Sequence, residues 1–417
     1  MKTSVLKFGG TSVKSIGRIH HVADIIAKRA LENPLIVVVS AMGDTTDYLI
    51  KLAKQCVNKP DSRELDLLIT TGEQISISLL TMALKSKGIK AHSFLGFQVG
   101  IFTETIHSKA RIIDIKSETL EKALKDNDVI VVAGFQGITA DGEITTLGRG
   151  GSDTTAVALA AAINADVCDI YTDVNGIYTT DPNLVAKASL LATISSEEVL
   201  EMARLGAQVI HPRAVELARQ HKVKMRIRNT FKPEHEGTTI LAEPGESDME
   251  IYRTVSGVAI DKDQARVAIL EIPDQPGVAA QVMKALADKN VVIDMIVQSY
   301  HPADGLSTMA FTVNATDLDT TVSALNSIKD KLGAKEVLAD PDIAKVSIIG
   351  AGMQSQPGVA AKMFSTLGAH GINIKMISTS EMTITCVVDK NSADKAAAYI
   401  HEAFELHNIN TTKSKAV

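Results

Sequence analysis

The C-terminal part of this sequence contains an internal repeat. Gln275–Ala280 recurs as Gln356–Ala361, and the offset of 81 residues holds without a gap as far as Ser299 and Ser380. Each copy is typical of a strand, a Pro-Gly turn, a helix and a strand with alternating apolar residues. The alternating residues are Val291, Ile293 and Met295 in the first copy and Ile372, Ile374 and Met376 in the second. The repeat predicts two small β-α-β modules in tandem.

The sequence before the repeat follows a different pattern, in which apolar runs alternate with amphipathic stretches up to about Glu243. Continuous apolar runs are typical of parallel strands buried on both faces; they are Leu35–Val39, Val129–Val132 and Val167–Tyr171. Helical spacing is found over Ile16–Leu31, Leu65–Leu84 and Thr154–Ile163. The alternation predicts an α/β sandwich with its ligand site at the carboxyl ends of the strands.

Short local signals refine this outline. Asp141-Gly142, between Ile138 and Ile144, predicts a hairpin at the margin of the sheet. Asp61 with Glu64 predicts a capping box at a helix start. The acidic, turn-rich segment Glu243–Asp248 predicts a linker between the two parts of the chain.

Length and composition exclude several classes of protein. A chain of 417 residues is expected to form two or three domains. Its net charge of −6, with no block of Lys or Arg, argues against nucleic acid as a partner. The three cysteines (Cys56, Cys168, Cys386) are far apart, so we expect neither zinc nor disulfides. With no signal peptide and apolar runs too short to span a bilayer, the expected location is cytoplasmic, away from membranes.

Two glycines end the first predicted strand. Val5, Leu6 and Phe8 are followed by Gly9-Gly10, and a helical pattern begins near Ser15. Backbone N–H groups in such a turn, ahead of a helix, form an anion-binding concavity. Lys7 adds a positive charge beside it. An ordinary β-turn with a solvated surface lysine explains the same residues when they are considered alone.

Four more polar loops follow predicted strands or lead into a predicted helix. They are Ser40–Asp47, Gly134–Gly137, Leu147–Thr154 and Tyr171–Tyr178. The chain contains no Walker A sequence and no kinase Gly-x-Gly-x-x-Gly pattern, and no His-Glu-x-x-His or Ser/His/Asp arrangement is evident. Phosphoryl transfer needs mainly positioning and neutralisation of charge, which these loops can supply together with Mg²⁺.

These loops resemble, in order and over essentially the whole chain, those of aspartate kinase of the monofunctional bacterial type. The resemblance rests on the loops just described, on Thr71-Gly72-Glu73 and on the paired Gln-Pro-Gly modules. It implies an amino-acid-kinase fold, a three-layer αβα sandwich around a mainly parallel sheet, followed by two ferredoxin-like βαββαβ ACT modules. The implied limits are 1–243 for the kinase domain, 244–250 for the linker, 265–340 for the first ACT module, and 251–264 with 341–417 for the second.

The resemblance also implies roles for single residues in the kinase domain. The nucleotide contacts would be Lys7, Phe8, Gly9, Gly10, Thr172, Asp173, Tyr178 and Asn183. The aspartate contacts would be Ser40, Thr46, Glu73, Arg149, Gly150, Ser152 and Asp153, and Lys7, Arg149 and Asp153 are also expected to serve catalysis. Arg149 would grip the α-carboxylate and Glu73 with Asp153 the α-ammonium group. At position 183 the family often has arginine, so Asn183 lacks a charge that relatives bring to the phosphates.

Each of these residues also has a purely structural interpretation. Arg149 could be an exposed loop arginine, Glu73 a solvated helix residue and Asp153 a helix N-cap. Ser40 and Thr46 are common turn residues, and Tyr178 could be a core residue. Two other functions stay open: another small-molecule kinase of the same fold, acting on glutamate, acetylglutamate or UMP, and a non-catalytic amino-acid sensor.

The expected reaction needs no general base, because a carboxylate with a pKa of ~4 is ionised at neutral pH. ATP with Mg²⁺ and L-aspartate would give ADP and 4-phospho-L-aspartate, the first step toward lysine, threonine, methionine and isoleucine. Mg²⁺ held by phosphates and water requires no dedicated protein cage, and none is predicted.

The ACT resemblance implies feedback inhibition by lysine, threonine or both. The effector contacts would be Asp274, Gly277, Val278, Ala279 and Gln298. The alternative for Asp274–Gly277 is a plain β-turn before a helix. ACT modules pair side by side, so a homo-oligomer or an α2β2 assembly is expected, with edge strands such as Val291–Ile296 covered.

Overall fold

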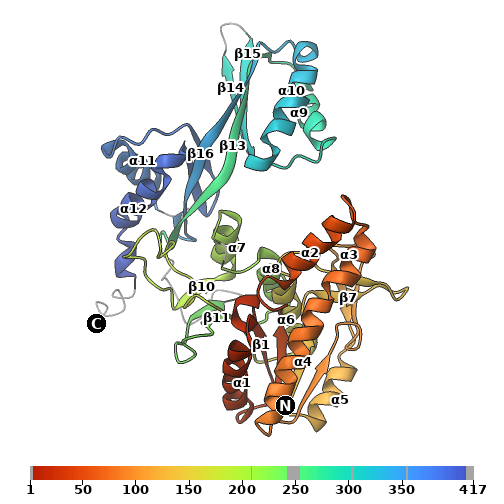
Figure 1. The fold of residues 1–417 in the computed structure, drawn as a ribbon. Helices are drawn as coiled ribbons and strands as arrows, with labels where there is room; N and C mark the ends of the chain where they lie inside the picture. Colours follow the sequence, from red (N-terminus) through yellow and green to blue (C-terminus); the bar gives the residue numbers. More distant parts are fainter. Residues whose placement is uncertain (1–2, 208, 242–253, 302–304, 354–355, 410–417) are drawn as a thin grey trace. The chain divides into compact units, whose positions relative to one another are not determined.

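The computed structural model describes residues 3–207, 209–241, 254–301, 305–353 and 356–409. The predicted linker, 244–250, lies outside the described residues. The chain forms two compact units (Figure 1). Unit 1 comprises Met1–Ile177, Leu190–Ala203 and Gln208–Glu250; unit 2 comprises Tyr178–Ser189, Arg204–Ala207 and Ile251–Val417.

Unit 1 is built on an eight-stranded sheet with the order β10-β12-β11-β9-β1-β2-β6-β3. Neighbouring strands are parallel except β11 and β12. The strands are β1 (Ser4–Phe8), β2 (Leu35–Val39), β3 (Ala91–Phe94), β6 (Val129–Ala133), β9 (Val167–Thr172), β10 (Thr193–Ser195), β11 (Met225–Asn229) and β12 (Thr238–Leu241). The predicted apolar strands are therefore confirmed, and they run at the centre of the sheet.

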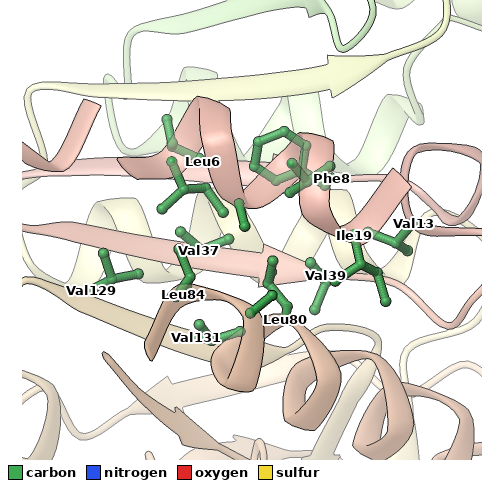
Figure 2. Close-up of a cluster of buried hydrophobic side chains, with 14 of the residues drawn as sticks. Leu6, Phe8, Val13, Ile19, Val37, Val39, Leu80, Leu84, Val129 and Val131 are labelled. Carbon is green, nitrogen blue, oxygen red and sulfur yellow. The ribbon is translucent and has the colours of Figure 1, made fainter. Parts of the chain in front are cut away.

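Helices cover both faces of this sheet. They are α1 (Ile16–Ala30), α2 (Thr45–Cys56), α3 (Ser62–Ile69), α4 (Thr71–Ser86), α5 (Glu118–Asp126), α6 (Gly151–Ala162), α7 (Ser196–Arg204) and α8 (Pro212–Gln220), with a 3₁₀ turn, η1, at Gly10–Val13. Side chains of α1 and α4 pack on one face in a buried cluster with β1, β2 and β6 (Figure 2). Helix α6 contacts β1, β2 and β9, and its side chains are almost all buried. The predicted three layers are present.

A smaller four-stranded sheet, β5-β4-β7-β8, completes unit 1. Its strands are β4 (Ile101–Thr103), β5 (Ile112–Ile115), β7 (Gln136–Ile138) and β8 (Ile144–Thr146). The hairpin predicted at Asp141-Gly142 joins β7 to β8, with Gly142 at a φ of 88°.

The single helix predicted over Leu65–Leu84 is divided in the structure. Helices α3 and α4 are separated at Thr70, where the hydroxyl donates to Leu67 O; the next residue, Thr71, likewise donates to Leu68 O. These side-chain bonds compete for carbonyls of the helix ladder. The run Ser62–Ser86 is long and apolar enough to cross a membrane by composition, but 56% of its apolar stretch is buried inside the protein, as in a core helix.

The start of α3 corrects one detail of the predicted capping box. The Asp61 carboxylate accepts from the backbone N–H groups of Arg63 and Glu64, as predicted. Glu64 does not complete the box by turning back to the cap, because its carboxylate pairs with the neighbouring Arg63 at 2.5 Å.

Unit 2 holds a six-stranded antiparallel sheet, β14-β15-β13-β16-β18-β17. Its elements are β13 (Gly257–Pro273), α9 (Val278–Ala287), β14 (Ile293–His301), β15 (Leu306–Asn314), η2 (Ala315–Asp317), α10 (Leu318–Leu332), β16 (Glu336–Ile349), α11 (Val359–Ala369), β17 (Met376–Thr379), β18 (Thr383–Asp389), η4 (Lys390–Ser392), α12 (Ala393–Ala403) and η5 (Leu406–Asn408). The two repeat copies occupy opposite halves of this one sheet.

Two long strands serve both modules. In β13, Val267–Leu270 pairs with Glu336–Ala339 of β16, while Gly257–Asp261 pairs with Lys345–Ile349. The buried Val255 and Val258 pack with α11 and α12 in the second module's core. The limits of the domains stay a prediction.

The predicted alternating strands begin later than expected. Val291 precedes β14, and Ile372 and Ile374 precede β17. Ile372 and Ile374 pack on the core of the second module instead of joining a ladder, because β17 pairs with β18 only over Met376–Thr379.

Candidate functional site

The turns that follow four parallel strands meet at one edge of the large sheet. Ser40 N donates to Phe8 O at 3.1 Å, and Gly134 N donates to Val39 O at 3.0 Å. Gly9 N donates to Tyr171 O at 3.4 Å. The ends of β1, β2, β6 and β9 are thus side by side, as expected for a ligand site of an α/β sheet.

A cavity of about 280 Å³ opens at this edge. It brings together most of the predicted site residues of the kinase domain. Its lining comprises Lys7, Gly9, Gly10, Ser40, Ala41, Gly43, Thr46, Glu73, Phe135, Gly150, Gly151, Ser152 and Asp153. Ala41, Gly43, Phe135 and Gly151 were missed as site residues; each lies beside or within a loop that the sequence had singled out.

Gly10, in the glycine turn after β1, has no room for a side chain. A Cβ on Gly10 would lie 2.9 Å from Ala41 O and 3.2 Å from Gly43 O. Gly43 N donates to Gly10 O at 3.0 Å, which joins this turn to the loop after β2. The side chain of Phe8 points into the core, where it stacks on Tyr171 with ring centroids 4.6 Å apart. Any contact of Phe8 with a nucleotide would therefore use its backbone.

Lys7 and Asp153 form an ion pair within the cavity. Their Nζ and Oδ1 atoms are 2.5 Å apart, and the side chains are 12% and 13% exposed. Lys7 comes from β1 and Asp153 from the first turn of α6. Asp153 therefore neutralises the lysine when no ligand is present, a pairing that sequence reasoning did not predict.

Glu73 is a buried carboxyl group at the wall of the cavity. It is 2% exposed, and its Oε1 accepts from Ala41 N at 3.0 Å. Its Oε2 has no hydrogen-bond partner among the described residues. Burial raises the pKa of Glu73 to about 8, against the opposing effect of the Ala41 N–H. Its burial rules out a solvated helix residue, and the raised pKa favours the protonated form at neutral pH.

The loop that carries Arg149 is tightly built around an exposed side chain. Gly150 has a φ of 70°, and a Cβ there would lie 2.2 Å from the Cγ atom of His211. A Cβ on Gly134 would lie 2.6 Å from the Oγ atom of Ser152. Arg149 itself is exposed and does not contribute to the cavity lining. Its reach into the cavity stays a prediction.

The loop after β9 is braced by polar residues from the end of β11. Asn229 Nδ2 donates to Asn175 Oδ1 at 2.7 Å, and Thr230 N donates to Thr172 O at 2.8 Å. The Thr230 hydroxyl hydrogen-bonds Ser12 at 2.7 Å, which ties this loop to the turn after β1. Asn229 and Thr230 were not predicted from the sequence; their place at the end of the alternating strand β11 was the available signal.

Thr172 and Asp173 are adjacent on that loop, and the Thr172 hydroxyl donates to Asp173 Oδ1 at 3.2 Å. Tyr178 and Asn183 belong to unit 2. There the backbone N–H and side-chain amide of Asn183 both donate to Asp181 Oδ1, at 2.8 and 3.0 Å. The nucleotide roles of these four residues stay predictions.

The predicted effector residues lie in the first repeat copy. Gly277 precedes α9 at a φ of 92°, with Val278 partly buried against the core of the module and Ala279 exposed. Asp274 is exposed, and its N–H donates to Gly305 O at 3.0 Å. Gln298 Nε2 donates to Ser307 Oγ at 3.3 Å. The structure leaves the side chains of this turn open to solvent.

Among the described residues, no group of three or more His, Cys, Asp and Glu side chains could hold a metal ion. The cavity instead presents a lysine, a glycine turn and two carboxyl groups. This set suits a metal that arrives with phosphate groups, as Mg²⁺ does with a nucleotide.

Comparison with known proteins bears on both units. The amino acid kinase family matches residues 2–229, and ACT domains match residues 266–330 and 346–404. An aspartokinase from Bacillus sp. (strain MGA3) is 48% identical over 403 residues, which cover 96% of this chain and 97% of that protein.

Solved structures agree with this result. E. coli aspartokinase III in complex with aspartate and ADP has a TM-score of 0.77 at 25% identity, over 96% of this chain and 99% of that one. The same enzyme in complex with lysine and aspartate has a TM-score of 0.75, with the same identity and coverage.

Proposed function

This chain belongs to the aspartokinase family, and we propose that it transfers the γ-phosphoryl group of ATP to the side-chain carboxylate of L-aspartate. The products are ADP and 4-phospho-L-aspartate. The observation that carries this proposal is the cavity that gathers Lys7, the Gly9-Gly10 turn, Glu73 and Asp153 at the carboxyl ends of parallel strands. E. coli aspartokinase III, which shares the fold, binds aspartate and ADP.

The chemical step needs charge neutralisation rather than a base. The attacking carboxylate is ionised at neutral pH, since its pKa is ~4 in model compounds. Two anions must therefore approach each other, and donors aimed at the transferring group stabilise the transition state. Lys7 Nζ and the amide of Gly10 supply these donors, whereas the Gly9 N–H is already bonded to Tyr171 O. Because Gly10 has no side chain, its backbone can approach a phosphate group closely.

Substrate binding exchanges the partners of the Lys7–Asp153 ion pair. Phosphate oxygens take over Lys7, and the α-ammonium group of aspartate takes the place of the lysine at Asp153. This exchange keeps both groups paired in the free and the bound protein, which avoids leaving a buried charge uncompensated.

Glu73 supplies the second acceptor for the ammonium group. Its Oε2 is buried without a hydrogen-bond partner among the described residues and belongs to the cavity wall. Because its pKa is raised to about 8, Glu73 releases a proton when the cationic group binds near neutral pH. Arg149 grips the α-carboxylate with its planar guanidinium, and the hydroxyls of Ser40 and Thr46 complete the contacts.

A Mg²⁺ ion that arrives with the nucleotide would neutralise part of the phosphate charge, beside Lys7. Thr172 and Asp173 complete the nucleotide contacts of unit 1, and the nucleotide roles of Tyr178 and Asn183 stay predictions. Asn183 offers hydrogen bonds without the positive charge of the arginine common in relatives.

The ACT modules make the enzyme a target of feedback inhibition. We assign the effector site to Asp274, Gly277, Val278, Ala279 and Gln298, and the effector to lysine, threonine or both. The lysine complex of E. coli aspartokinase III supports an amino-acid effector. The enzyme then starts the cytoplasmic pathway to lysine, threonine, methionine and isoleucine as an oligomer paired through its ACT modules.

Trapping of the acyl phosphate with hydroxylamine tests the proposal directly. Protein, ATP, Mg²⁺ and L-aspartate should yield aspartyl hydroxamate, and lysine, threonine or both should suppress it. Product from glutamate but not from aspartate would reject the substrate assignment. Absence of product with every acceptor would reject catalysis and favour an amino-acid sensor.

A further inference from the structure

The loop that carries Arg149 is held from outside the cavity by side chains with no assigned ligand contact. We define the arginine loop as residues 147–150, between β8 and α6. Asp66 of α3 and Arg213 of α8 both reach this region. The geometry points to Asp66 and Arg213 as positioning residues that set where Arg149 meets the substrate. This inference rests on the proposed function, because it concerns the group assigned to the α-carboxylate of aspartate.

Asp66 is a completely buried carboxylate that collects donors from two segments. It accepts from Thr146 N at 3.0 Å and from the Thr146 hydroxyl at 2.7 Å. It also accepts from Ser108 N at 2.9 Å and lies 3.1 Å from His107 Nδ1. A buried carboxylate is costly unless it is hydrogen-bonded in this way. Asp66 therefore fixes Thr146, directly before the arginine loop, against the segment at Ser108.

Ser108 transmits this restraint to the loop itself. Its φ of 66° is left-handed, a conformation that is strained for serine and persists only where the surroundings impose it. The Ser108 carbonyl oxygen lies only 2.9 Å from the position of a Cβ on Gly148. The bond from Ser108 N to Asp66 thus holds a carbonyl against the residue that precedes Arg149.

Arg213 holds the loop from α8. Its Nη1 donates to Leu147 O at 2.9 Å, and its Nη2 donates to Ala110 O at 2.7 Å. Ala110 N in turn donates to Thr146 O at 2.9 Å. The rigid fork of a guanidinium can bridge two carbonyls in a fixed geometry, which a lysine ammonium cannot reproduce.

The other side of the loop is equally constrained. His211 packs beneath Gly150, where it would collide with any Cβ. Gly151 N donates to Gly148 O at 3.0 Å and closes the turn around Arg149. Arg149 is the exposed residue of this loop. The backbone on both sides of Arg149 is pinned, while its side chain is exposed.

If Asp66 had a purely structural role, its substitution would lower the stability of the protein without raising KM for aspartate more than KM for ATP. Asp169 provides a matched control, since it is also completely buried in unit 1 and is paired with Arg226 at 2.6 and 2.8 Å, away from the arginine loop. Asp66→Asn and Asp169→Asn make the same chemical change at two buried carboxylates.

The test compares KM for aspartate, KM for ATP and kcat in the full-length wild-type protein and both variants. In Asp66→Asn, KM for aspartate should rise roughly tenfold to a hundredfold, with KM for ATP and kcat within about twofold. Asp169→Asn should leave KM for aspartate within about twofold at a similar loss of melting temperature. Equal effects of the two variants on aspartate would overturn the inference.

A double-mutant cycle with Arg149→Ala tests whether Asp66 affects aspartate binding through Arg149. If Asp66 acts through Arg149, Asp66→Asn should change kcat/KM for aspartate by less than about twofold in the Arg149→Ala background. Full additivity of the two losses would contradict this route. If Asp66→Asn does not fold, Arg213→Lys replaces it in the same measurements. Arg213→Lys should raise KM for aspartate by a smaller factor, and its effect should likewise not add to that of Arg149→Ala.

Amide hydrogen exchange separates this inference from the proposed function. Exchange over residues 146–150 should accelerate at least tenfold in Asp66→Asn and not in Asp169→Asn. Unchanged exchange would overturn the positioning role even in an active enzyme. A wild-type protein that makes no aspartyl hydroxamate would instead reject the function, and the exchange measurement would still decide whether Asp66 holds the loop.

Discussion

The glycine turn of the kinase cavity and the glycine turns of the two ACT modules require glycine for different reasons. At Gly10 a Cβ would collide with two backbone carbonyls, although the backbone conformation itself is ordinary. At Gly277 and Gly358 a Cβ would meet nothing within 4 Å, but φ is 92° and 94°. The first turn needs space for close packing, and the other two need a left-handed backbone.

The acidic groups that we assign to ligand binding also differ between the two sites, because one is buried and the other is exposed. Glu73 is buried, and its pKa is raised to about 8. Asp274, beside Gly277, is exposed. A buried carboxyl group such as Glu73 is expected to couple substrate binding to proton release and to tolerate little change. An open turn such as the one at Asp274 can change its affinity with little effect on the rest of the fold.

The largest effect is expected from Gly10→Ala. The new Cβ must displace the turn from the carbonyls of Ala41 and Gly43, so kcat/KM should fall about a hundredfold or more. Gly17→Ala is the control, because Gly17 lies in α1 with nothing within 4 Å of an added Cβ. Steady-state kinetics should show Gly17→Ala at the wild-type level. More than half of wild-type activity in Gly10→Ala would remove the distinction between the two kinds of turn.

The next effect concerns the pH dependence of aspartate binding. Glu73 must be ionised to pair with the ammonium group, and its pKa in the free protein is about 8. KM for aspartate should therefore fall roughly tenfold from pH 7 to pH 9. Glu73→Gln should bind aspartate weakly at all pH values in this range. A wild-type KM independent of pH would mean that Glu73 does not pair with the substrate.

Glu73 should also affect the stability of the protein. Its ionised form is expected to favour aspartate binding, but its protonated form is expected to favour the folded state. Its raised pKa means that the protonated form stabilises the fold below pH 4.5, and that this contribution is lost as the pH rises through about 8. Glu73→Gln should therefore be more stable than the wild type at pH 8, by on the order of 2–4 kcal/mol, and no more stable near pH 4.5. Urea denaturation at both pH values measures this difference. Equal stabilities at pH 8 would contradict the raised pKa.

A smaller and selective effect is expected from Asp274→Ala in the open turn. The effector concentration for half-inhibition should rise roughly tenfold, the usual loss for one charged hydrogen bond, while the uninhibited rate stays within about twofold. Asp288→Ala, at the far end of α9, is the control. Inhibition curves that coincide for both variants and the wild type would place the effector elsewhere.

The smallest effects should come from the two repeat glycines. Gly277→Ala and Gly358→Ala impose the same left-handed strain, about 1 kcal/mol each, and should lower the melting temperature by similar amounts. Only Gly277→Ala should raise the half-inhibitory concentration, by a fewfold. A larger shift in Gly358→Ala would assign the effector site to the second copy.

Local patterns in the sequence were sufficient for the central strands of the large sheet and for most of the cavity, but they missed the break between α3 and α4. Strands such as Leu35–Val39 are buried on both faces, so they read as continuous apolar runs that no loop resembles. Glycines where space or φ demands them mark the turns, and the repeat marks the two modules. Because parallel strands bring their carboxyl ends to one edge, the polar loops after them could be predicted to meet.

The tertiary structure decided which polar side chains and which strands pair with each other. Segments distant in sequence are joined by the ion pair of Lys7 with Asp153 and by the hydrogen bonds of Asp66 to Thr146. The raised pKa of Glu73 likewise depends on the segments that bury it. The shared strands β13 and β16 likewise depend on long-range pairing. Periodicity records which side of an element is buried, but the charge state and orientation of a buried polar group depend on neighbours that only the folded chain brings near.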